Sequence, residues 1–390
     1  MGLKKAGDKR EIIKSRYFSY YCGDLPKGCR YCVKGQKLVL FITGLCDENC
    51  YFCPVSDRKI HKDVIYANER PISNIKEAIE EAKLCGAKGA GITGGDPLKK
   101  TDRCVKYIKG LKKEFGPDFH IHLYTPLTLV TENKIKALAE AGLDELRFHP
   151  FLDSEKGWHK IALAGTFPNL KYGVEIPAIP GKEKMIIKLI DFIKDKVEFL
   201  NINELEISDS NANMLRKMGY EVKDEISYAI KGSEELAMKM LEYASHTTNL
   251  NVHYCTAKLK DKKQLANRIK RRAENIATPY DVITPEGTLI RVVLYPDELK
   301  PGYSYEKRLN LLNFKKRKEV EVKLKNIKHE FESRHKNIFL MLDTKNLRLI
   351  TNPQTLSKIK KQLSDKGLVA AVVEEYPTYD SMLIEVDFID

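Results

Sequence analysis

Three cysteines lie within eight residues of one another, in the run Cys46-Asp47-Glu48-Asn49-Cys50-Tyr51-Phe52-Cys53. This CxxxCxxC spacing lets one short loop supply three thiolate ligands to a cubane iron–sulfur cluster, which leaves the fourth iron without a protein ligand. An iron of that kind can bind a substrate or a cofactor, so the cluster can do chemistry as well as carry electrons. Two other interpretations are a three-thiolate zinc site completed by a distant ligand and a group of reduced structural thiols.

A second set of cysteines lies on either side of this run. Cys29 and Cys32 form a CxxC pair ahead of it, and Cys255 follows His253 in a strand-like stretch far downstream. With either Cys22 or His253 as the fourth ligand, these residues predict a second metal site. Spacing does not separate an auxiliary iron–sulfur cluster from a zinc ion that staples the N-terminal segment to the rest of the fold. Reduced, unligated thiols are the third interpretation.

Two apolar runs place the chemistry at the ends of strands. Leu38–Thr43 is typical of a strand buried on both faces, and it ends in Gly44, so the thiols emerge from its C-terminal end. Ala90–Thr93 ends in Gly94-Gly95-Asp96-Pro97. The glycines can bring backbone close to a ligand, while the proline blocks continuation of the strand. Many turns contain such a motif, and its place one strand–helix unit after the cysteines makes it informative.

Together these motifs resemble those of the radical S-adenosylmethionine (radical SAM) superfamily, over roughly residues 36–250. The resemblance implies that Cys46, Cys50 and Cys53 are the ligands of a [4Fe–4S] cluster that binds S-adenosylmethionine (SAM). It also implies that Phe52 abuts the adenine.

The resemblance extends to the second motif. Gly94, Gly95, Asp96 and Pro97 match a GGEP motif in which Asp replaces Glu. In the family this segment hydrogen-bonds the amino group of the methionine moiety, largely through backbone atoms, so the replacement changes little.

Within the superfamily, the phrases Lys27–Cys32, Phe41–Cys46 and His253–Cys255 resemble an uncharacterised, mostly archaeal group described as related to pyruvate formate-lyase activating enzymes. The resemblance implies that a ferredoxin or flavodoxin reduces the cluster. The reduced cluster then splits SAM into methionine and a 5′-deoxyadenosyl radical that abstracts hydrogen from a substrate. RNA and protein are candidate macromolecular substrates, and a small molecule is the alternative. Two alternatives stay open: an activase of a glycyl-radical enzyme, and a non-catalytic iron–sulfur or zinc protein that binds RNA.

Strands and helices alternate along the chain after the first strand. Predicted helices include Ile72–Cys85, Thr101–Phe115 and Thr131–Ala141, and predicted strands include His120–Thr125, Glu145–Phe148, Tyr172–Ile176 and Glu198–Ile207. Such alternation implies parallel strands joined by right-handed crossovers. Six strands are predicted in all, which suits the α/β, partial (β/α)6 TIM-like barrel of the resembled superfamily.

Barrel enzymes work at the C-terminal ends of their strands. The polar residues at or near such ends are Tyr124, His149, Glu175, Asn203 and Glu204. Glu175, His149 and Glu204 are the catalytic candidates, and Asn203 is a candidate for contacting the cofactor. Glu175 is the strongest, because an acid in an apolar strand needs a partner or a cavity. Ordinary turn and loop hydrogen bonding is the alternative for each.

Composition divides the chain into four predicted parts. These are a Cys-containing extension over 1–35, the barrel over 36–257, a basic helical linker over 258–282, and a small α+β domain over 283–390 that is a candidate substrate-binding domain. Lys258–Arg272 holds eight Lys and Arg against one acid, and Lys300–Lys328 holds ten against three. The last domain has strand, helix and turn signals that allow a ferredoxin-like arrangement.

The net charge of +13 makes an anionic partner such as RNA credible, although Lys- and Glu-rich composition is also typical of proteins from hot environments.

No apolar stretch approaches the roughly 18–20 residues needed to span a membrane. Met1–Lys5 lacks the apolar core of a secretion signal. Nine clustered cysteines favour metal binding in a reducing cytoplasm over a disulfide framework. Cys85 and Cys104 fall in helical patterns and are predicted to be packing residues.

Overall fold

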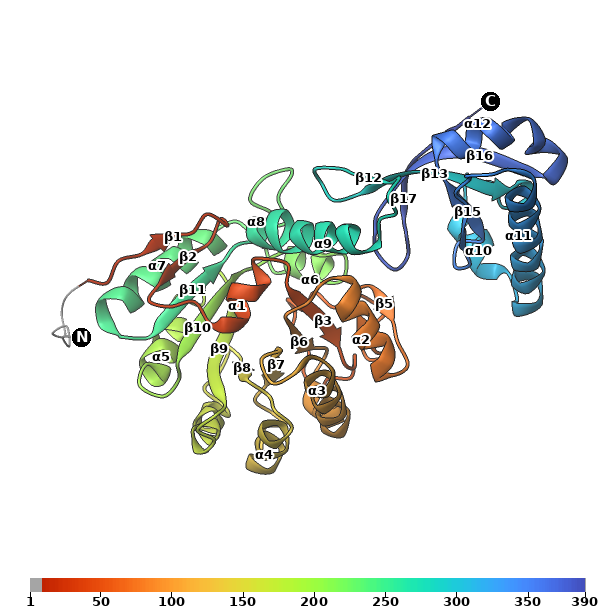
Figure 1. Cartoon of the computed structure of the whole chain (residues 1–390). Helices are drawn as coiled ribbons and strands as arrows, with labels where there is room; N and C mark the ends of the chain where they lie inside the picture. The colour runs from red at the N-terminus through yellow and green to blue at the C-terminus, as the bar shows by residue number, and fades with distance from the viewer. Residues whose placement is uncertain (1–8, 390) are drawn as a thin grey trace. The chain divides into compact units, whose positions relative to one another are not determined.

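The computed structural model describes residues 9–389, and the chain divides into two compact units, Met1–Arg268 and Ile269–Asp390 (Figure 1). Met1–Lys5, for which we predict no secretion signal, lies outside the described residues. The division falls within helix α9 (Ala266–Ile276), inside the segment predicted to be a basic helical linker. Each unit is described below by itself.

Seven parallel strands form the centre of the first unit. They are β3 (Lys37–Phe41), β6 (Gly89–Thr93), β7 (His120–Pro126), β8 (Glu145–His149), β9 (Lys171–Ala178), β10 (Phe199–Glu204) and β11 (Asn251–Cys255). Their order across the sheet is their order along the chain, as in a barrel that is not closed. The predicted partial barrel is confirmed, and β11 adds a seventh parallel strand to the six predicted.

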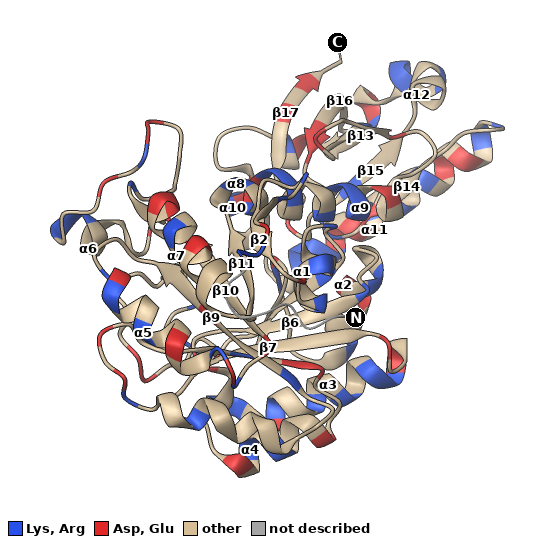
Figure 2. Ribbon diagram, turned by 90° about the vertical axis from the view of Figure 1, so that its left-hand side faces the viewer, with Lys and Arg blue, Asp and Glu red and all other residues tan. Residues whose placement is uncertain are grey.

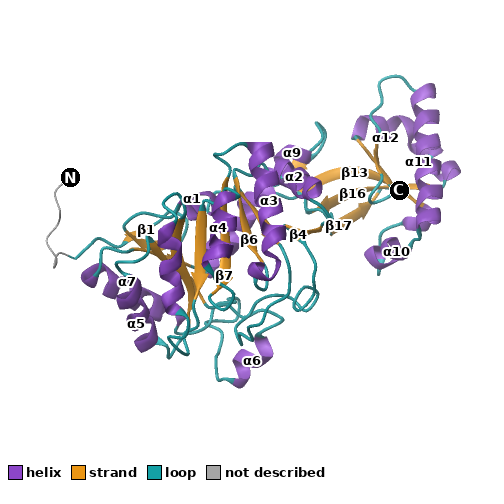
Figure 3. Cartoon of the chain, turned by 90° about the horizontal axis from the view of Figure 1, so that it is seen from below, coloured by secondary structure: helices purple, strands orange, loops and turns teal. Residues whose placement is uncertain are grey.

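Helices cover the outer face of this curved sheet (Figure 3). They are α2 (Ile75–Leu84), α3 (Thr101–Phe115), α4 (Glu132–Glu140), α5 (Glu183–Ile193) and α7 (Ser233–Thr247), and the short α6 (Ala212–Lys217) follows β10. Thr131 caps α4 as predicted, because its side chain accepts from Lys134 N–H. The α2 helix begins later than predicted, because Asn74 and Glu77 form a capping box ahead of Ile75.

Shorter elements complete the edges of the sheet. The N-terminal segment forms β1 (Ile13–Lys14) and β2 (Tyr20–Cys22), and β2 pairs antiparallel with β11. Helix α1 (Lys27–Cys32) then packs against β3, β6 and β7. At the other edge, β4 (Tyr66–Ala67) and β5 (Arg70–Pro71) extend the sheet beyond β3. The predicted extension is therefore part of the barrel sheet.

The second unit contains a six-stranded antiparallel sheet. Its strands are β12 (Val282–Ile283), β13 (Leu289–Pro296), β14 (Met341–Asp343), β15 (Arg348–Thr351), β16 (Leu368–Glu375) and β17 (Leu383–Phe388), and its helices are α10 (Tyr305–Leu311), α11 (Phe314–Arg334) and α12 (Pro353–Ile359). The main order is β14-β15-β13-β16-β17. With α11 between β13 and β14, and α12 between β15 and β16, this is a ferredoxin-like arrangement with β17 added at one edge.

Charges of both signs alternate over the helices, as Figure 2 shows along α4, α5 and α7. Helix α8 (Ala257–Leu259) follows β11 and continues through a π-helical stretch, Lys260–Leu265, into α9. Within residues 9–389, no helix is both long enough and apolar enough to cross a membrane.

Candidate active site

The cysteine loop, Cys46–Cys53, begins just beyond the C-terminal end of β3. Gly44 fixes its start, because its N–H donates to Lys62 O at 2.8 Å and its carbonyl accepts from His61 N–H at 2.9 Å. A Cβ on Gly44 would lie 1.7 Å from Lys59 O. Only glycine therefore lets the two stretches of backbone approach this closely.

The three thiols of the loop are partly exposed. Burial, and after it the charges of the neighbouring Cys53 and Cys46, raise the pKa of Cys50 to about 12. A cationic metal cluster removes this opposition to ionisation, because its binding releases the thiol protons. This donor set therefore fits the expected iron–sulfur cluster. Within residues 9–389, no three His, Cys, Asp or Glu side chains are arranged to hold a metal as they stand, so binding requires side-chain rotation.

The Gly94–Pro97 segment is tied to the start of the cysteine loop. Gly95 N–H donates to Thr43 O and Asp96 N–H donates to Leu45 O, both at 2.8 Å. A Cβ on Gly94 would lie 2.3 Å from Thr43 O. Because the amides of this segment hold the loop, we expect its contacts with a ligand to come through carbonyl oxygens.

The Asp96 carboxylate has a local structural role. It accepts from Leu98 N–H at 3.0 Å and from the Thr125 hydroxyl at 2.8 Å, and it is buried. It caps the short 3₁₀ helix Pro97–Lys100, and burial raises its pKa. The side chain is thus occupied in holding the backbone, which agrees with the small effect expected of Asp in place of Glu.

Phe52 and His149 bring the cysteine loop to the ends of β8 and β9. Their ring centroids lie 5.8 Å apart. His149 Nδ1 lies 2.8 Å from Glu175 O and donates to it, which leaves Nε2 as the second ring nitrogen. Burial lowers the pKa of His149, so the imidazole is neutral at pH 7. Asn211, in the loop after β10, holds the other side of the loop by donating to Phe52 O at 3.1 Å.

The inner face of the barrel carries a group of buried charges, which we name the interior ion cluster: Glu145, Arg147 and Glu175. Arg147 pairs with Glu175 at 2.8 Å, and its Nε donates to Glu145 at 2.6 Å. Burial, the largest single influence, would raise the pKa of Glu175, but the charge of Arg147 and the hydrogen bonds to the carboxylate together outweigh it, and the net pKa is lowered. Glu175 is therefore an ionised, fully partnered acid.

Two asparagines complete the surroundings of Glu175. Asn201 Nδ2 donates to one carboxylate oxygen at 2.8 Å, and Asn203 Nδ2 donates to the other at 2.9 Å. Tyr124 joins the group, since Arg147 Nη1 lies 3.0 Å from its hydroxyl oxygen. The predicted residues Tyr124, Glu175 and Asn203 thus meet on one surface.

Glu204 does not join them. Residues of a strand alternate between faces, so Asn203 faces inward and Glu204 faces outward. Its carboxylate accepts from Ala257 N–H, in the first turn of α8, at 2.7 Å, while Thr256 is the N-cap of that helix. Burial raises its pKa. The structure therefore gives this catalytic candidate a structural contact in place of access to the inner face.

Sequence reasoning missed several inner-face residues: Lys37, His120, His122, Arg147 and Asn201. Each of these side chains is buried. A signal was present, because polar residues occupy every second position in His120-Ile121-His122-Leu123-Tyr124 and in Glu145-Leu146-Arg147-Phe148-His149. That period marks one polar face of each strand, opposite the face that packs against the helices.

The residues of the predicted second metal site separate into two groups by the face of the sheet on which they lie: an inner group with Cys29, His253 and Cys255, and Cys22 alone on the outer side. Cys29, on α1, lies against the interior ion cluster, with Arg147 Nη2 and Asn201 Nδ2 each 3.4 Å from its Sγ. His253 and Cys255 lie on the inward-facing positions of β11. Cys22 lies on the outer face, in the hydrophobic core. The interactions of the first group are described further below.

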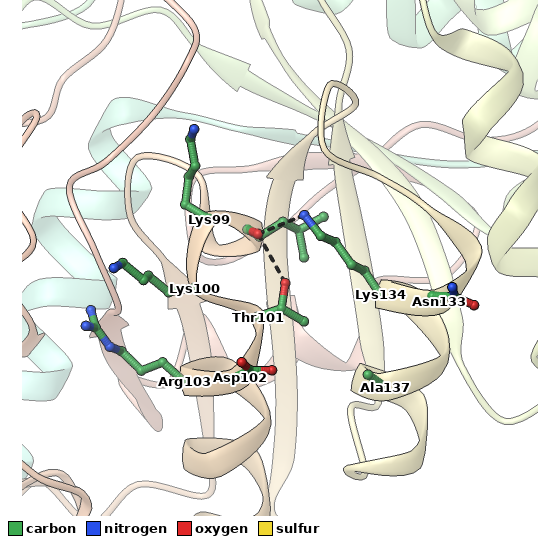
Figure 4. Close-up of a pocket in the computed structure, with 9 residues that line it drawn as sticks. Lys99, Lys100, Thr101, Asp102, Arg103, Asn133, Lys134 and Ala137 are labelled. Carbon is green, nitrogen blue, oxygen red and sulfur yellow. Dashed lines mark hydrogen bonds between the residues drawn. The ribbon is translucent and has the colours of Figure 1, made fainter.

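A pocket on the surface adjoins the cysteine loop (Figure 4). We name it the basic pocket after its four cations, Lys99, Lys100, Arg103 and Lys134. Lys99 pairs with Asp47 of the cysteine loop at 2.6 Å. Lys134 Nζ donates to Leu98 O at 3.0 Å, as the dashed line in Figure 4 shows. The pocket thus joins the loop to the N-terminal ends of α3 and α4.

Comparison with known proteins gives consistent matches. A family model described as the radical SAM superfamily matches residues 40–154, which include the cysteine loop, Gly94–Pro97 and His149. A protein of Methanocaldococcus jannaschii, provisionally named a glycyl-radical enzyme activating enzyme, is 43% identical over 383 residues, covering 95% of this chain and 94% of the relative. Biotin synthase of Rickettsia felis is 33% identical over 136 residues, covering 34% of this chain and 41% of that protein.

Two solved structures also match. The radical SAM methyltransferase TsrM of Kitasatospora setae, with tryptophan and a SAM analogue bound, aligns with a TM-score of 0.36 and 12% identity over 64% of this chain and 54% of that chain. The radical SAM enzyme coproporphyrinogen III oxidase of Escherichia coli aligns with a TM-score of 0.36 and 11% identity over 58% of this chain and 57% of that chain. Each alignment spans little more than half of the solved chain.

Proposed function

Because the chain belongs to the radical SAM superfamily, we propose that Cys46, Cys50 and Cys53 hold a [4Fe–4S] cluster and that SAM binds beside it, between Phe52 and Gly94–Pro97. When bound and reduced, this pair supplies a 5′-deoxyadenosyl radical by cleavage of a carbon–sulfur bond of SAM. The chain's own contribution is to fix the geometry of the two motifs and to exclude water from the inner face.

One observation carries this proposal: the two motifs are tied to each other through backbone alone. The hydrogen bonds from Gly95 to Thr43 and from Asp96 to Leu45 set the loop and the GGDP segment at a fixed separation. Backbone contacts of this kind do not depend on rotamers, so the backbone of the two motifs is set before any ligand enters and only the thiol side chains have to rotate. The polar inner face next to Phe52 and His149 then supplies a place for the substrate.

We infer that the substrate is a protein, with a glycine residue of a partner as the first candidate. The name of the M. jannaschii relative and its 43% identity over nearly the whole chain support this class. RNA is disfavoured because cations in the basic segments are used internally. Lys260 pairs with Glu206, and Arg268 pairs with Glu69.

The basic pocket suits the electron donor that this chemistry needs. Lys99 pairs with Asp47, and Lys100 and Arg103 pair with Asp63, but within residues 9–389 Lys134 forms no ion pair and keeps its charge for an acidic donor protein. Opposite charge steers the encounter of two proteins more than it tightens their complex. We therefore infer that the donor docks over Lys99 and Lys134.

The test is reductive cleavage of SAM by anaerobically reconstituted protein. We expect Cys50→Ala to form no measurable 5′-deoxyadenosine, because one of the three cluster ligands is removed. Cys85→Ala, a buried cysteine on the outer side of the barrel, should keep activity within about twofold. Cleavage by Cys50→Ala at the wild-type rate would contradict the proposal.

A second measurement tests the substrate class. A peptide carrying a candidate glycine, deuterated at its α-carbon, should transfer deuterium to 5′-deoxyadenosine if that hydrogen is abstracted. The alternative substrate class is tested in parallel by crosslinking total cellular RNA to the full chain. Deuterium transfer without RNA crosslinks supports a protein substrate, and the reverse result excludes it.

A further inference from the structure

Helix α1 enters the barrel far enough to touch the interior ion cluster. Gly28 N–H lies 3.3 Å from a Glu145 carboxylate oxygen, and a Cβ on Gly28 would lie 2.5 Å from Arg147 Nη2. This approach places Cys29 against side chains of β8 and β10. Its Sγ accepts from Arg147 and from Asn201, at 3.4 Å each. N–H donors directed at sulfur are the surroundings that stabilise a metal-bound thiolate.

Cys32 and Cys255 lie next to this position. Cys255 packs with Val33, the residue after Cys32, and with Leu259. Cys255 stands opposite Asn203 in the register of β10 and β11, two residues along the strand from the Asn201 that contacts Cys29. The three thiols therefore lie near one another, although more than two hundred residues separate the first two from the third. No local motif in the sequence shows this meeting.

His253 adds a nitrogen donor on the same face. It is 2% exposed, and neither Nδ1 nor Nε2 has a hydrogen-bond partner among the described residues. It stands opposite Asn201 in the register of β10 and β11, and the Asn201 Oδ1 atom is also without a partner. Buried polar atoms normally have partners, because leaving one without a partner forfeits its hydrogen bonds to water. A ligand that accepts the imidazole lone pair would remove that cost.

The same register decides between the two predicted fourth ligands. Cys22 pairs with Val252, the neighbour of His253, so the Cys22 side chain points to the opposite face of the sheet. It is fully buried in the hydrophobic core between the sheet and the helices. His253 shares the inward face with Cys255, and Cys22 does not.

A cation lies against the first of these thiols. Arg147 Nη2 is 3.4 Å from Cys29 Sγ. A metal held by three thiolates carries net negative charge. The guanidinium offsets part of that charge inside the protein, where an isolated anion would be costly.

We propose that Cys29, Cys32, Cys255 and His253 form a second, thiolate-bound metal centre, occupied by a zinc ion or an iron–sulfur cluster. Binding releases one proton from each thiol to solvent and forms three metal–sulfur bonds and one metal–nitrogen bond. As in the cysteine loop, side-chain rotation brings the donors together. The centre links α1 to β11 and lies beside Glu175, at the inner face where the substrate is placed. It does not depend on the proposed cleavage of SAM.

The experiment uses the full chain with the first site removed. The variant Cys46→Ala/Cys50→Ala/Cys53→Ala is purified anaerobically, and zinc, iron and acid-labile sulfide are measured per chain. We expect either about one zinc, or about four irons with about four sulfides and an absorption band near 400 nm, as these centres contain. Either content supports the centre and identifies its metal. A metal-free variant with native near-ultraviolet circular dichroism overturns it.

Further substitutions in that background assign the ligands. Adding Cys32→Ser, at the least buried of these thiols, should lower metal content at least fivefold, and adding His253→Ala should speed metal loss to a chelator at least tenfold. Adding Cys85→Ala is the matched control and should change neither. Full metal retention after Cys32→Ser contradicts the assignment. Because the background cannot cleave SAM, failure here leaves the proposed function intact, and failure of SAM cleavage in the wild type leaves this result intact.

Discussion

Gly44 joins β3 to the cysteine loop at a point where a methyl group has no room. The carbonyl of Lys59 occupies the space that a Cβ would need, and that carbonyl is backbone, so it cannot rotate away. Its neighbour Thr43 is fixed by a 2.9 Å hydrogen bond to Asp63, which Arg103 also holds at 2.6 Å. The position of the first cysteine therefore depends on residues that carry no chemistry themselves.

Gly44→Ala should destabilise the first unit by about 1–3 kcal/mol, because the overlap forces the backbone to move. Iron content after reconstitution should fall by at least half, since the loop is displaced. Trp158, the single tryptophan, is buried in the first unit and reports its unfolding by fluorescence. Gly302→Ala is the control, because a Cβ there meets nothing within 4 Å. Equal unfolding midpoints for the two variants would contradict this account.

Lys37 makes the stability of the first unit depend on pH. Burial lowers its pKa to about 7. The unfolded chain, with a lysine pKa near 10.4, then binds more protons than the folded chain at every pH between these values. The contribution of Lys37 to stability therefore rises with pH across that window.

Lys37→Met should remove that rise. Between pH 7 and 8.5 the metal-free wild type should gain up to about 2 kcal/mol of unfolding free energy relative to the variant. Denaturant unfolding followed by Trp158 fluorescence measures the difference. The range ends at pH 8.5 because buried thiols such as Cys50 have raised pKa values and make stability fall with pH above about 9. Parallel pH profiles for wild type and variant would show that Lys37 is protonated throughout.

At the scale of elements, the sequence predicts where strands and helices lie, but it does not predict which residues of a strand face the inside of the barrel. The strands and α3 lie close to their predicted ranges, because long apolar and amphipathic runs carry a local signal. The cysteine loop was likewise predictable from spacing. Asn203 and Glu204 were both candidates, however, and only the register of β10 decides which one faces inward. The meeting of Cys29 with Arg147 was beyond reach, because it depends on the pairing of β2 with β11.

The basic pocket yields a prediction about the N-terminal ends of α3 and α4. Lys134→Glu should lower the rate driven by ferredoxin or flavodoxin about fivefold, chiefly through weaker association. The rate driven by dithionite, which needs no docking, should stay within about twofold. Lys109→Glu makes the same charge change on α3 outside the pocket, and it should affect neither rate. Equal losses with both reductants would show that Lys134 affects SAM cleavage itself and not the docking of the donor protein.

At the scale of the whole molecule, the net charge of +13 overstates the free positive surface. Along α11, acids three or four residues away pair with the cations: Lys318 and Lys325 with Glu321, Lys328 with Glu332, and Arg334 with Glu330. Pairs at this spacing stabilise an exposed helix modestly and leave little charge for a polyanion.

RNA binding by the full chain should therefore be weak and mostly lost at 150 mM salt. The slope of log K against log salt should be shallower than about −3, as expected for few phosphate contacts. Filter binding with a structured RNA measures it. The variant Glu321→Gln/Glu332→Gln frees cations on α11 and should steepen the slope. A wild-type slope steeper than about −6 would restore RNA as the substrate class.

The pairing of β2 with β11 also sets an order of events during synthesis. A ribosome synthesises β2 and α1 early and β11 only after every other parallel strand. During that time β2 lacks its partner β11. Long-range pairing of this kind is slow and leaves intermediates exposed. Until β11 emerges, Cys29 and Cys32 are exposed to solvent and are open to oxidants and to other metals. Closing the sheet is therefore also the step that protects these thiols.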